Sequence, residues 1–160
     1  MKYRRFEDLP VWQDAIELAV RVFALTAKPQ LRPFRGVRDQ IGRSSVSISN
    51  NIAEGFERGT TQELLTFLYI ARGSSGETRS VLCLMDRLPC LEDLKSEISD
   101  LKSRSERISP QIRGWCESLQ NSEIRGQRYL TDKARRIAKQ AKERQEFLRE
   151  LEAMKSQNPR

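Results

Sequence analysis

The chain contains no histidine, and this absence excludes more chemistry than any other feature of its 160 residues. Histidine is the commonest general base and the commonest zinc ligand, so Ser-His-Asp and Cys-His nucleophile systems are excluded. The three cysteines have no Cys-x-x-Cys spacing, and a cysteine zinc site is therefore not expected either. We expect a protein that is not an enzyme and that has no catalytic residues, no metal and no cofactor.

Long apolar runs, aromatic residues and glycine are also scarce. The longest nearly apolar stretch, residues 64–71, is far too short to cross a bilayer, and no signal-peptide pattern follows the basic N-terminus. Aromatic residues make up 7% of the chain and there are 8 glycines, so few strands and turns are expected. These features predict a cytoplasmic protein built from helices with narrow apolar faces, in which the cysteines are reduced and partly buried.

The positive charge is unevenly distributed along the sequence. Residues 1–120 contain 18 Lys and Arg against 16 Asp and Glu, a net of +2. Residues 121–160 contain 11 against 6, a net of +5. This excess predicts a polyanionic partner for the last quarter of the chain, although a basic helix that only keeps the protein in solution would have the same composition.

Apolar residues recur at intervals of three and four in four successive segments, which predicts four amphipathic helices. The helices are expected to begin and end near residues 8–28, 35–58, 62–87 and 91–119. The short connections between them predict an all-α, antiparallel up-down-up-down four-helix bundle over residues 1–119. A hinge and an additional basic C-terminal helix are expected over residues 120–160, with the helix at about 129–155.

Several residues mark the ends of these helices. Asp8 is expected to cap the first helix, with Pro10 in its first turn, and Thr61 is expected to cap the third. Pro110 should kink the fourth helix or split it, and in the second case Ser109 would cap a new helix.

The second and third helices have centres rich in small residues, at 43–51 and 71–76. Small side chains let two backbones approach, so these centres should face each other and their hydroxyl groups should bond to helix carbonyls. Asn50 and Asn51 could contact a base edge, but hydrogen bonds between helices are favoured for them. The tryptophans Trp12 and Trp115 lie on apolar stripes, which favours core or subunit contacts over base stacking.

Charged residues lie close to both small-residue centres. They are either a functional site or a partly buried ion-pair network that fixes the helix register, and the network is favoured because two carboxylates without histidine or metal are a weak acid-base signal. The residues are Arg43, Glu54, Glu77 and Arg79.

The C-terminal segment is the best candidate for binding nucleic acid. Arginine and lysine side chains can contact phosphates, and a tyrosine ring can stack on an unpaired base. The expected binding residues are Arg125, Arg128, Tyr129, Lys133, Arg135, Arg136, Lys139, Lys142 and Arg144. A coiled-coil or docking helix is the alternative, since glutamates dilute the charge after residue 145.

Three motifs carry a resemblance to a known family. They are FEDLPVWQ at residues 6–13, QIGRSSVSISNNIAEG at 40–55 and FLYIARGSSGE at 67–77. In this order, across residues 3–119, they resemble the bacterial four helix bundle protein family, whose members are encoded in intervening sequences of large-subunit ribosomal RNA genes. That family is similar in fold to the accessory variability determinant, Avd, of diversity-generating retroelements.

The resemblance implies an antiparallel four-helix bundle that assembles into a ring, commonly a pentamer. Avd-like members bind nucleic acid on a basic outer surface and are partners of a reverse transcriptase. The family often has a second basic residue where Gly42 stands, so a positive cluster there is expected to be weaker in this chain. The segment from Gln120 lies outside the family core, and the resemblance implies nothing about its role.

Two functions of different kinds remain in view. The first is a homo-oligomeric adaptor that binds nucleic acid, with RNA favoured, and possible partnership with a reverse transcriptase. The second is a structural or protein-interaction module that assembles into a ring and uses its basic C-terminal segment to dock a protein. Retarded migration of RNA in a gel at low salt would separate them.

Overall fold

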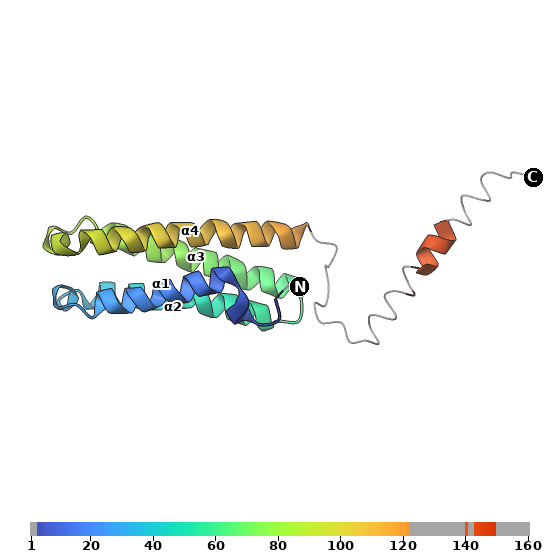
Figure 1. Cartoon of the computed structure of the whole chain (residues 1–160), viewed down its shortest axis with the longest axis horizontal. Helices are drawn as coiled ribbons and strands as arrows, with labels where there is room; N and C mark the ends of the chain where they lie inside the picture. Colours follow the sequence, from blue (N-terminus) through green and yellow to red (C-terminus); the bar gives the residue numbers. More distant parts are fainter. Residues whose placement is uncertain (1–2, 122–139, 141–142, 150–160) are drawn as a thin grey trace, which may run out of the picture. The chain divides into compact units, whose positions relative to one another are not determined.

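The computed structural model describes residues 3–121, 140 and 143–149. The chain divides into two units, Met1–Gly126 and Gln127–Arg160, which we describe separately. The first unit contains four long helices, and Figure 1 shows them packed side by side as a bundle. They are α1 (Pro10–Thr26), α2 (Arg35–Glu57), α3 (Thr61–Met85) and α4 (Lys95–Gln120).

Three short 3-10 helices precede or connect the long ones: η1 (Phe6–Asp8), η2 (Pro29–Leu31) and η3 (Pro89–Leu94). In the second unit, residues 143–149 are helical. No strand occurs in the part of the chain that the structure describes. The predicted all-α fold, a helical bundle with an additional C-terminal helix, is therefore confirmed.

The apolar stripes of the four long helices meet in one core. Side chains from every helix are completely buried there, and burial of this apolar surface is the main force that holds the bundle together. Examples with no exposed surface are Leu18 and Val22 of α1, Ile48 and Ile52 of α2, Leu68 and Leu82 of α3, and Ile98 and Ile112 of α4.

Small residues bring α2 and α3 close together, as the sequence predicted. Thr78 of α3 donates a hydrogen bond to Ser44 of α2 at 3.0 Å, and the hydroxyl oxygens of Ser47 and Ser74 are 2.9 Å apart. All four side chains are short, so the hydroxyl groups reach across only because the two backbones are near each other. These bonds fix how α2 and α3 are aligned along their length.

A second polar pair joins α3 to α4 inside the core. Ser75 donates its hydroxyl to the carbonyl of Ser105 at 3.2 Å, and Ser105 donates to the carbonyl of Ser75 at 3.0 Å. Both serines are about 1% exposed, so each hydroxyl needs this partner to avoid the cost of an unpaired buried polar group. Ser105 occupies a heptad position that is otherwise apolar, and this reciprocal pair explains why a serine is tolerated there.

Two predicted helix caps are wrong. Asp8 belongs to η1, and the residue that precedes α1 is Leu9, which makes no side-chain cap. Thr60 rather than Thr61 caps α3, because its hydroxyl accepts from the backbone N–H of Glu63 at 3.2 Å and donates to the Glu63 carboxylate at 2.7 Å. Thr61 is instead buried in the first turn of the helix.

The fourth helix also differs from its prediction. It continues without a break through Pro110, so the new helix capped by Ser109 is not formed. Proline removes one donor, but Pro110 and Glu106, whose carbonyl loses that donor, are both exposed to water. The α-helix also begins later than predicted, because residues 89–94 form η3, in which Leu91 has non-helical backbone angles.

Candidate nucleic-acid interface

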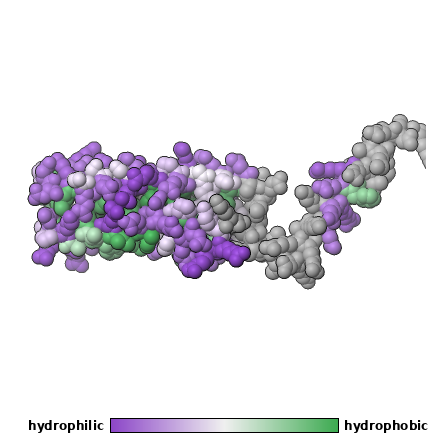
Figure 2. Space-filling view, in the orientation of Figure 1, coloured by the Kyte–Doolittle hydropathy of each residue, from purple (hydrophilic) through white to green (hydrophobic). Residues whose placement is uncertain are grey.

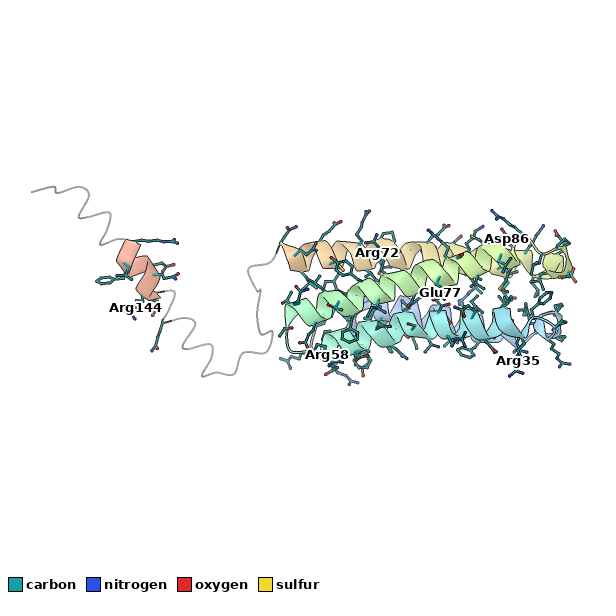
Figure 3. All side chains as sticks on the ribbon, turned by 180° about the vertical axis from the view of Figure 1, so that it is seen from behind. Arg35, Arg58, Arg72, Glu77, Asp86 and Arg144 are labelled. Atoms are coloured by element: carbon teal, nitrogen blue, oxygen red, sulfur yellow. The ribbon has the colours of Figure 1, made fainter. Side chains whose placement is uncertain are left out.

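The predicted binding residues fall mostly outside the described part of the chain. Arg144 is described: it lies in the helical segment 143–149, and its side chain is exposed (Figure 3). The interface as a whole therefore stays a prediction. The residues outside the described ones are Arg125, Arg128, Tyr129, Lys133, Arg135, Arg136, Lys139 and Lys142.

The segment 143–149 presents apolar as well as charged side chains. All seven of its residues are exposed, including Phe147 at 59% and Leu148 at 48%. Large apolar side chains next to each other and open to solvent are typical of a surface that packs against something else. This segment therefore has chemistry suited to a protein contact beside the arginines suited to phosphates.

Most charges of the bundle neutralise one another at its surface. The hydrogen bond from Arg104 holds the pKa of the Asp100 carboxylate below its usual range, and bonding to Glu17 raises the pKa of Arg21. Exposed pairs of this kind add little stability, but they leave few free charges. Further pairs are Arg5–Glu7, Lys28–Glu97, Arg35–Asp39, Arg58–Glu54, Lys95–Glu92, Lys102–Asp86 and Arg113–Glu117.

One short stretch of the bundle departs from this balance, and we call residues 28–43 the basic segment. It contains five cations and one anion, a net of +4, whereas the rest of 3–121 contains 12 cations and 15 anions, a net of −3. Charge summed over long sections of the sequence hides this segment, and a charge count over about 15 residues finds it. The cations are Lys28, Arg32, Arg35, Arg38 and Arg43, and the anion is Asp39.

The basic segment runs from η2 along the first half of α2. Arg35 projects into solvent at the start of α2, with 90% of its side chain exposed (Figure 3). Arg43 donates to the side-chain oxygen of Gln40 at 2.7 Å and has no ion pair within the described residues. The Nε of Arg38 is buried and has no acceptor in the structure. Two guanidinium groups here thus lack a carboxylate partner.

A groove lies where α1 meets the outer face of α2, and we call it the α1–α2 groove. Two adjoining hollows of about 430 Å³ and 370 Å³ share Phe23, Gly42 and Arg43 as walls. Phe23 is 55% exposed and Val20, on the same helix, is 59% exposed. Figure 2 shows the corresponding hydrophobic surface over α1, on a bundle that is otherwise largely hydrophilic. The remaining walls are Thr26, Arg38, Asp39, Val46, Ser47, Asn50 and Asn51.

The predicted buried ion-pair network near the small-residue centres is wrong. Arg43, Glu54 and Glu77 are exposed, and no ion pair joins them to one another or to Arg79 within the described residues. Glu77 instead accepts a hydrogen bond from Gln40, which links α3 to α2 at the surface (Figure 3). These side chains point outward because the serines and threonines occupy the interface between the helices.

The two asparagines of α2 also behave differently from the prediction. Asn51 donates to the carbonyl and the hydroxyl of Ser47, at 2.7 Å and 3.0 Å, so its bonds stay within its own helix. Asn50 is exposed and lines the α1–α2 groove. Its amide is therefore open to a ligand, whereas that of Asn51 is already used.

The tryptophans and cysteines of the bundle are largely structural. Trp12 and Trp115 pack against the core, and Trp12 meets the ring of Phe6 edge-on at 5.2 Å. Burial raises the pKa of the Cys116 thiol, which is the opposite of what a reactive cysteine needs. Cys83 is half-buried and Cys90 is exposed, so the expected partial burial does not extend to Cys90.

The described residues were also expected to hold no metal and no membrane span. No group of three or more potential metal ligands occurs in that part of the chain. None of its helices has both the length and the apolar character that crossing a membrane requires.

Comparison with known proteins identifies the family. No curated protein matches the sequence. A crystal structure at 1.70 Å resolution of a protein of unknown function, from the S23 ribosomal protein family of Bacteroides thetaiotaomicron VPI-5482, has a TM-score of 0.60 to this chain. The two are 24% identical, and the match covers 67% of this chain and 98% of that one, which shows a shared fold. The model of the 23S rRNA-intervening sequence protein family matches residues 7–114. The chain belongs to the 23S rRNA-intervening sequence protein family.

Proposed function

We propose that this protein is a cytoplasmic, non-enzymatic adaptor that binds nucleic acid, preferably RNA, through its C-terminal segment. The observation that carries this proposal is the division of charge along the chain. Residues 121–160 hold 11 cations against 6 anions, whereas the described bundle, residues 3–121, holds 17 against 16. A family named after 23S rRNA intervening sequences gives an RNA partner additional support.

The charge pattern supports a polyanion because the bundle neutralises most of its own cations through surface ion pairs. The excess after residue 120 has fewer acids to pair with, and phosphates are the natural counterions for arginine. Contacts to phosphates fix position without reading sequence, so binding should be general in sequence.

The proposal is tested by the salt dependence of RNA binding. The full chain is titrated into a fluorescent single-stranded RNA, and the dissociation constant is measured from about 50 to 200 mM salt, where phosphate contacts dominate the salt dependence. The test variant changes Arg125, Arg128, Arg135 and Arg136 to glutamine. If these four contact phosphates, the slope of log K against log salt becomes shallower by about 3.

A matched control removes the same charge from the bundle. Arg72, Arg79, Arg87 and Arg107 are exposed and have no ion pair within the described residues. Changing these four to glutamine should leave the slope unchanged. Equal slopes in the test variant and the control, or no binding by the parent even at about 50 mM salt, would show that the C-terminal segment does not bind RNA.

We further propose that the protein is a homo-oligomer, with a pentameric ring expected from the family resemblance. Exposed apolar side chains on α3 support self-association: Tyr69 at 46%, Ile70 at 47% and Leu84 at 49%. Native mass spectrometry of the full chain gives the subunit number directly. A monomer at micromolar concentration would end this part of the proposal.

A protein partner for the C-terminal segment is the second candidate function. The exposed Phe147 and Leu148 favour it, because apolar side chains contribute to protein contacts and little to phosphate contacts. A reverse transcriptase is the partner that the resemblance to Avd suggests. Changing both residues to serine should weaken capture of that partner and leave RNA affinity unchanged.

A further inference from the structure

The α1–α2 groove combines an exposed aromatic ring with guanidinium groups that have no carboxylate partner. We propose that this groove binds a single-stranded polynucleotide, in which a base stacks on Phe23 and the phosphates contact Arg38 and Arg43. The inference rests on the nucleic-acid binding proposed above but assigns it a second surface, on the folded bundle instead of the C-terminal segment.

The ring of Phe23 is suited to stacking on a base. It is 55% exposed, although a phenylalanine gains most by being buried. The wall of α2 beside it is Gly42, and even a Cβ at that position would lie 3.8 Å from the Cζ of Phe23. The absence of a side chain at Gly42 keeps the ring open on this side. Every base has a π face, so such a ring accepts any base.

The arginines supply the contacts to phosphate. Asp39 is the carboxylate in the groove wall, and it pairs with Arg35 at 3.7 Å, outside the hollows. Arg43 bonds to the neutral amide of Gln40, and the buried Nε of Arg38 has no acceptor. Phosphate oxygens are the acceptors that these two groups lack, and a net charge of +4 over residues 28–43 attracts a polyanion to this place.

Asn50 adds a group that can bond to a base edge. It lines the groove, is exposed and has no side-chain hydrogen bond within the described residues. An amide offers two donors and an acceptor, which suits the edges of unpaired bases. Stacking, phosphate contact and a free amide are thus arranged within one groove.

A second copy of this chain is a poorer fit for the same groove. It would bring an identical basic segment, and like charges across a contact repel each other. Several groove walls are polar, including Ser47 and Asn50, whereas an interface core excludes polar groups that remain unpaired. The charge and the lining therefore favour a polyanion over a protein.

The test measures binding of a fluorescent 12-nucleotide oligouridine to the full chain over a range of salt concentrations. Arg38→Gln/Arg43→Gln should make the slope of log K against log salt shallower by about 1.4, since two phosphate contacts are lost. Phe23→Ala should weaken binding by about 5- to 150-fold without changing that slope, because stacking releases no counterions. Arg43→Gln alone provides the same test at an exposed site if the double variant fails to fold.

Matched controls change the same residue types on other faces. Arg72 and Arg107 are exposed arginines of α3 and α4, and Leu84 is an apolar side chain of α3 that is 49% exposed. Arg72→Gln/Arg107→Gln and Leu84→Ala should leave affinity and slope as they are in the parent. A loss as large in these controls as in the groove variants would overturn the proposal.

Two other outcomes would also overturn it, and each is distinct from failure of the C-terminal site. If the groove variants leave RNA affinity unchanged while neutralisation of residues 125–136 abolishes it, the groove does not bind RNA. If the groove variants change the oligomeric mass but not RNA affinity, the groove is a contact between copies of the chain. If instead the groove variants weaken binding and neutralisation of residues 125–136 has no effect, the inference holds and the C-terminal proposal fails.

Discussion

Residues 28–43 and residues 125–144 are both strongly basic, but they differ in what surrounds their charges. The first stretch holds five cations against one anion and runs along η2 and α2, beside the exposed ring of Phe23. The second holds eight cations against two anions and follows the last residue of α4. The first is a smaller charge on a folded frame, and the second is a larger charge beyond it.

This difference teaches that amount of charge and arrangement of charge are separate contributions to binding. The spacing of Phe23, Arg38 and Arg43 depends on how α1 and α2 pack, because the groove exists only between them. The charge of the later stretch is a property of the sequence itself. Substitutions in the core should therefore affect the first contribution and spare the second.

The largest expected effect comes from neutralising both stretches together. A variant that changes Arg38, Arg43, Arg125, Arg128, Arg135 and Arg136 to glutamine loses six proposed phosphate contacts, so its salt slope should be shallower by about 4. If the stretches act independently, the loss in log K should equal the sum of the losses from the two separate variants. Fluorescence anisotropy with single-stranded RNA measures all three, and a combined loss far from the sum would mean that they form one site.

A cavity in the core should separate the two stretches most clearly. Ile48 of α2 is completely buried, and Ile48→Ala should lower the free energy of unfolding by about 2–5 kcal/mol. Urea unfolding followed by circular dichroism measures this change. Val20→Ala, at a side chain that is 59% exposed, is the control and should change stability by less than about 0.5 kcal/mol.

The same variant tests whether the groove needs the fold. At a temperature that unfolds Ile48→Ala but not the parent, adding Phe23→Ala to it should no longer change RNA affinity. Neutralising the arginines of 125–136 should still weaken binding there. A Phe23 effect that survived unfolding would show that the ring contributes only as an apolar residue and not as part of a groove.

A smaller effect is expected from Gly55, where α2 passes closest to α3. A Cβ at this position would lie 2.7 Å from the Cβ of Phe67, so Gly55→Ala should cost about 1–3 kcal/mol of stability through overpacking. A Cβ at Gly73 of α3 would meet nothing within 4 Å, and Gly73→Ala should instead stabilise the helix by about 0.5–1 kcal/mol. Equal signs for the two variants in urea unfolding would contradict the close approach of α2 and α3.

The bundle could be predicted from the sequence because its signals repeat. Apolar residues recur over four helices, and the alternate steps of α4 place Ile98, Leu101, Ile108 and Ile112 in the core as expected. A repeated pattern tolerates local errors, so the fold was correct although the caps at Asp8 and Thr61 were not. A cap depends on the backbone angles of a single residue, which periodicity does not specify.

The groove could not be predicted in the same way. Phe23 lies among the apolar residues of α1 and was expected on the face that packs, yet it is more than half exposed. Its position at the edge of the apolar stripe becomes visible only once α2 is placed beside it. The asparagines show the same limit, because the sequence did not distinguish the exposed Asn50 from Asn51, which bonds to Ser47.

The smallest expected effect is a pH dependence that belongs to the bundle alone, since residues 121–160 contain no cysteine. Burial is the main cause that raises the pKa of Cys116 above its ordinary value of 9.0, so the fold favours the neutral thiol. In the unfolded chain the thiol ionises at its ordinary pKa, and this ionisation stabilises the unfolded state. The contribution of Cys116 is therefore fully present below the ordinary pKa and is lost as the pH rises through the raised one. Urea midpoints should fall less between about pH 8 and pH 10 in Cys116→Ala than in the parent, while Cys90→Ala, at an exposed site, should follow the parent. If Cys116→Ala kept the parent's full pH dependence, other groups would account for it, and RNA binding by residues 125–144 provides the comparison because no thiol lies among them.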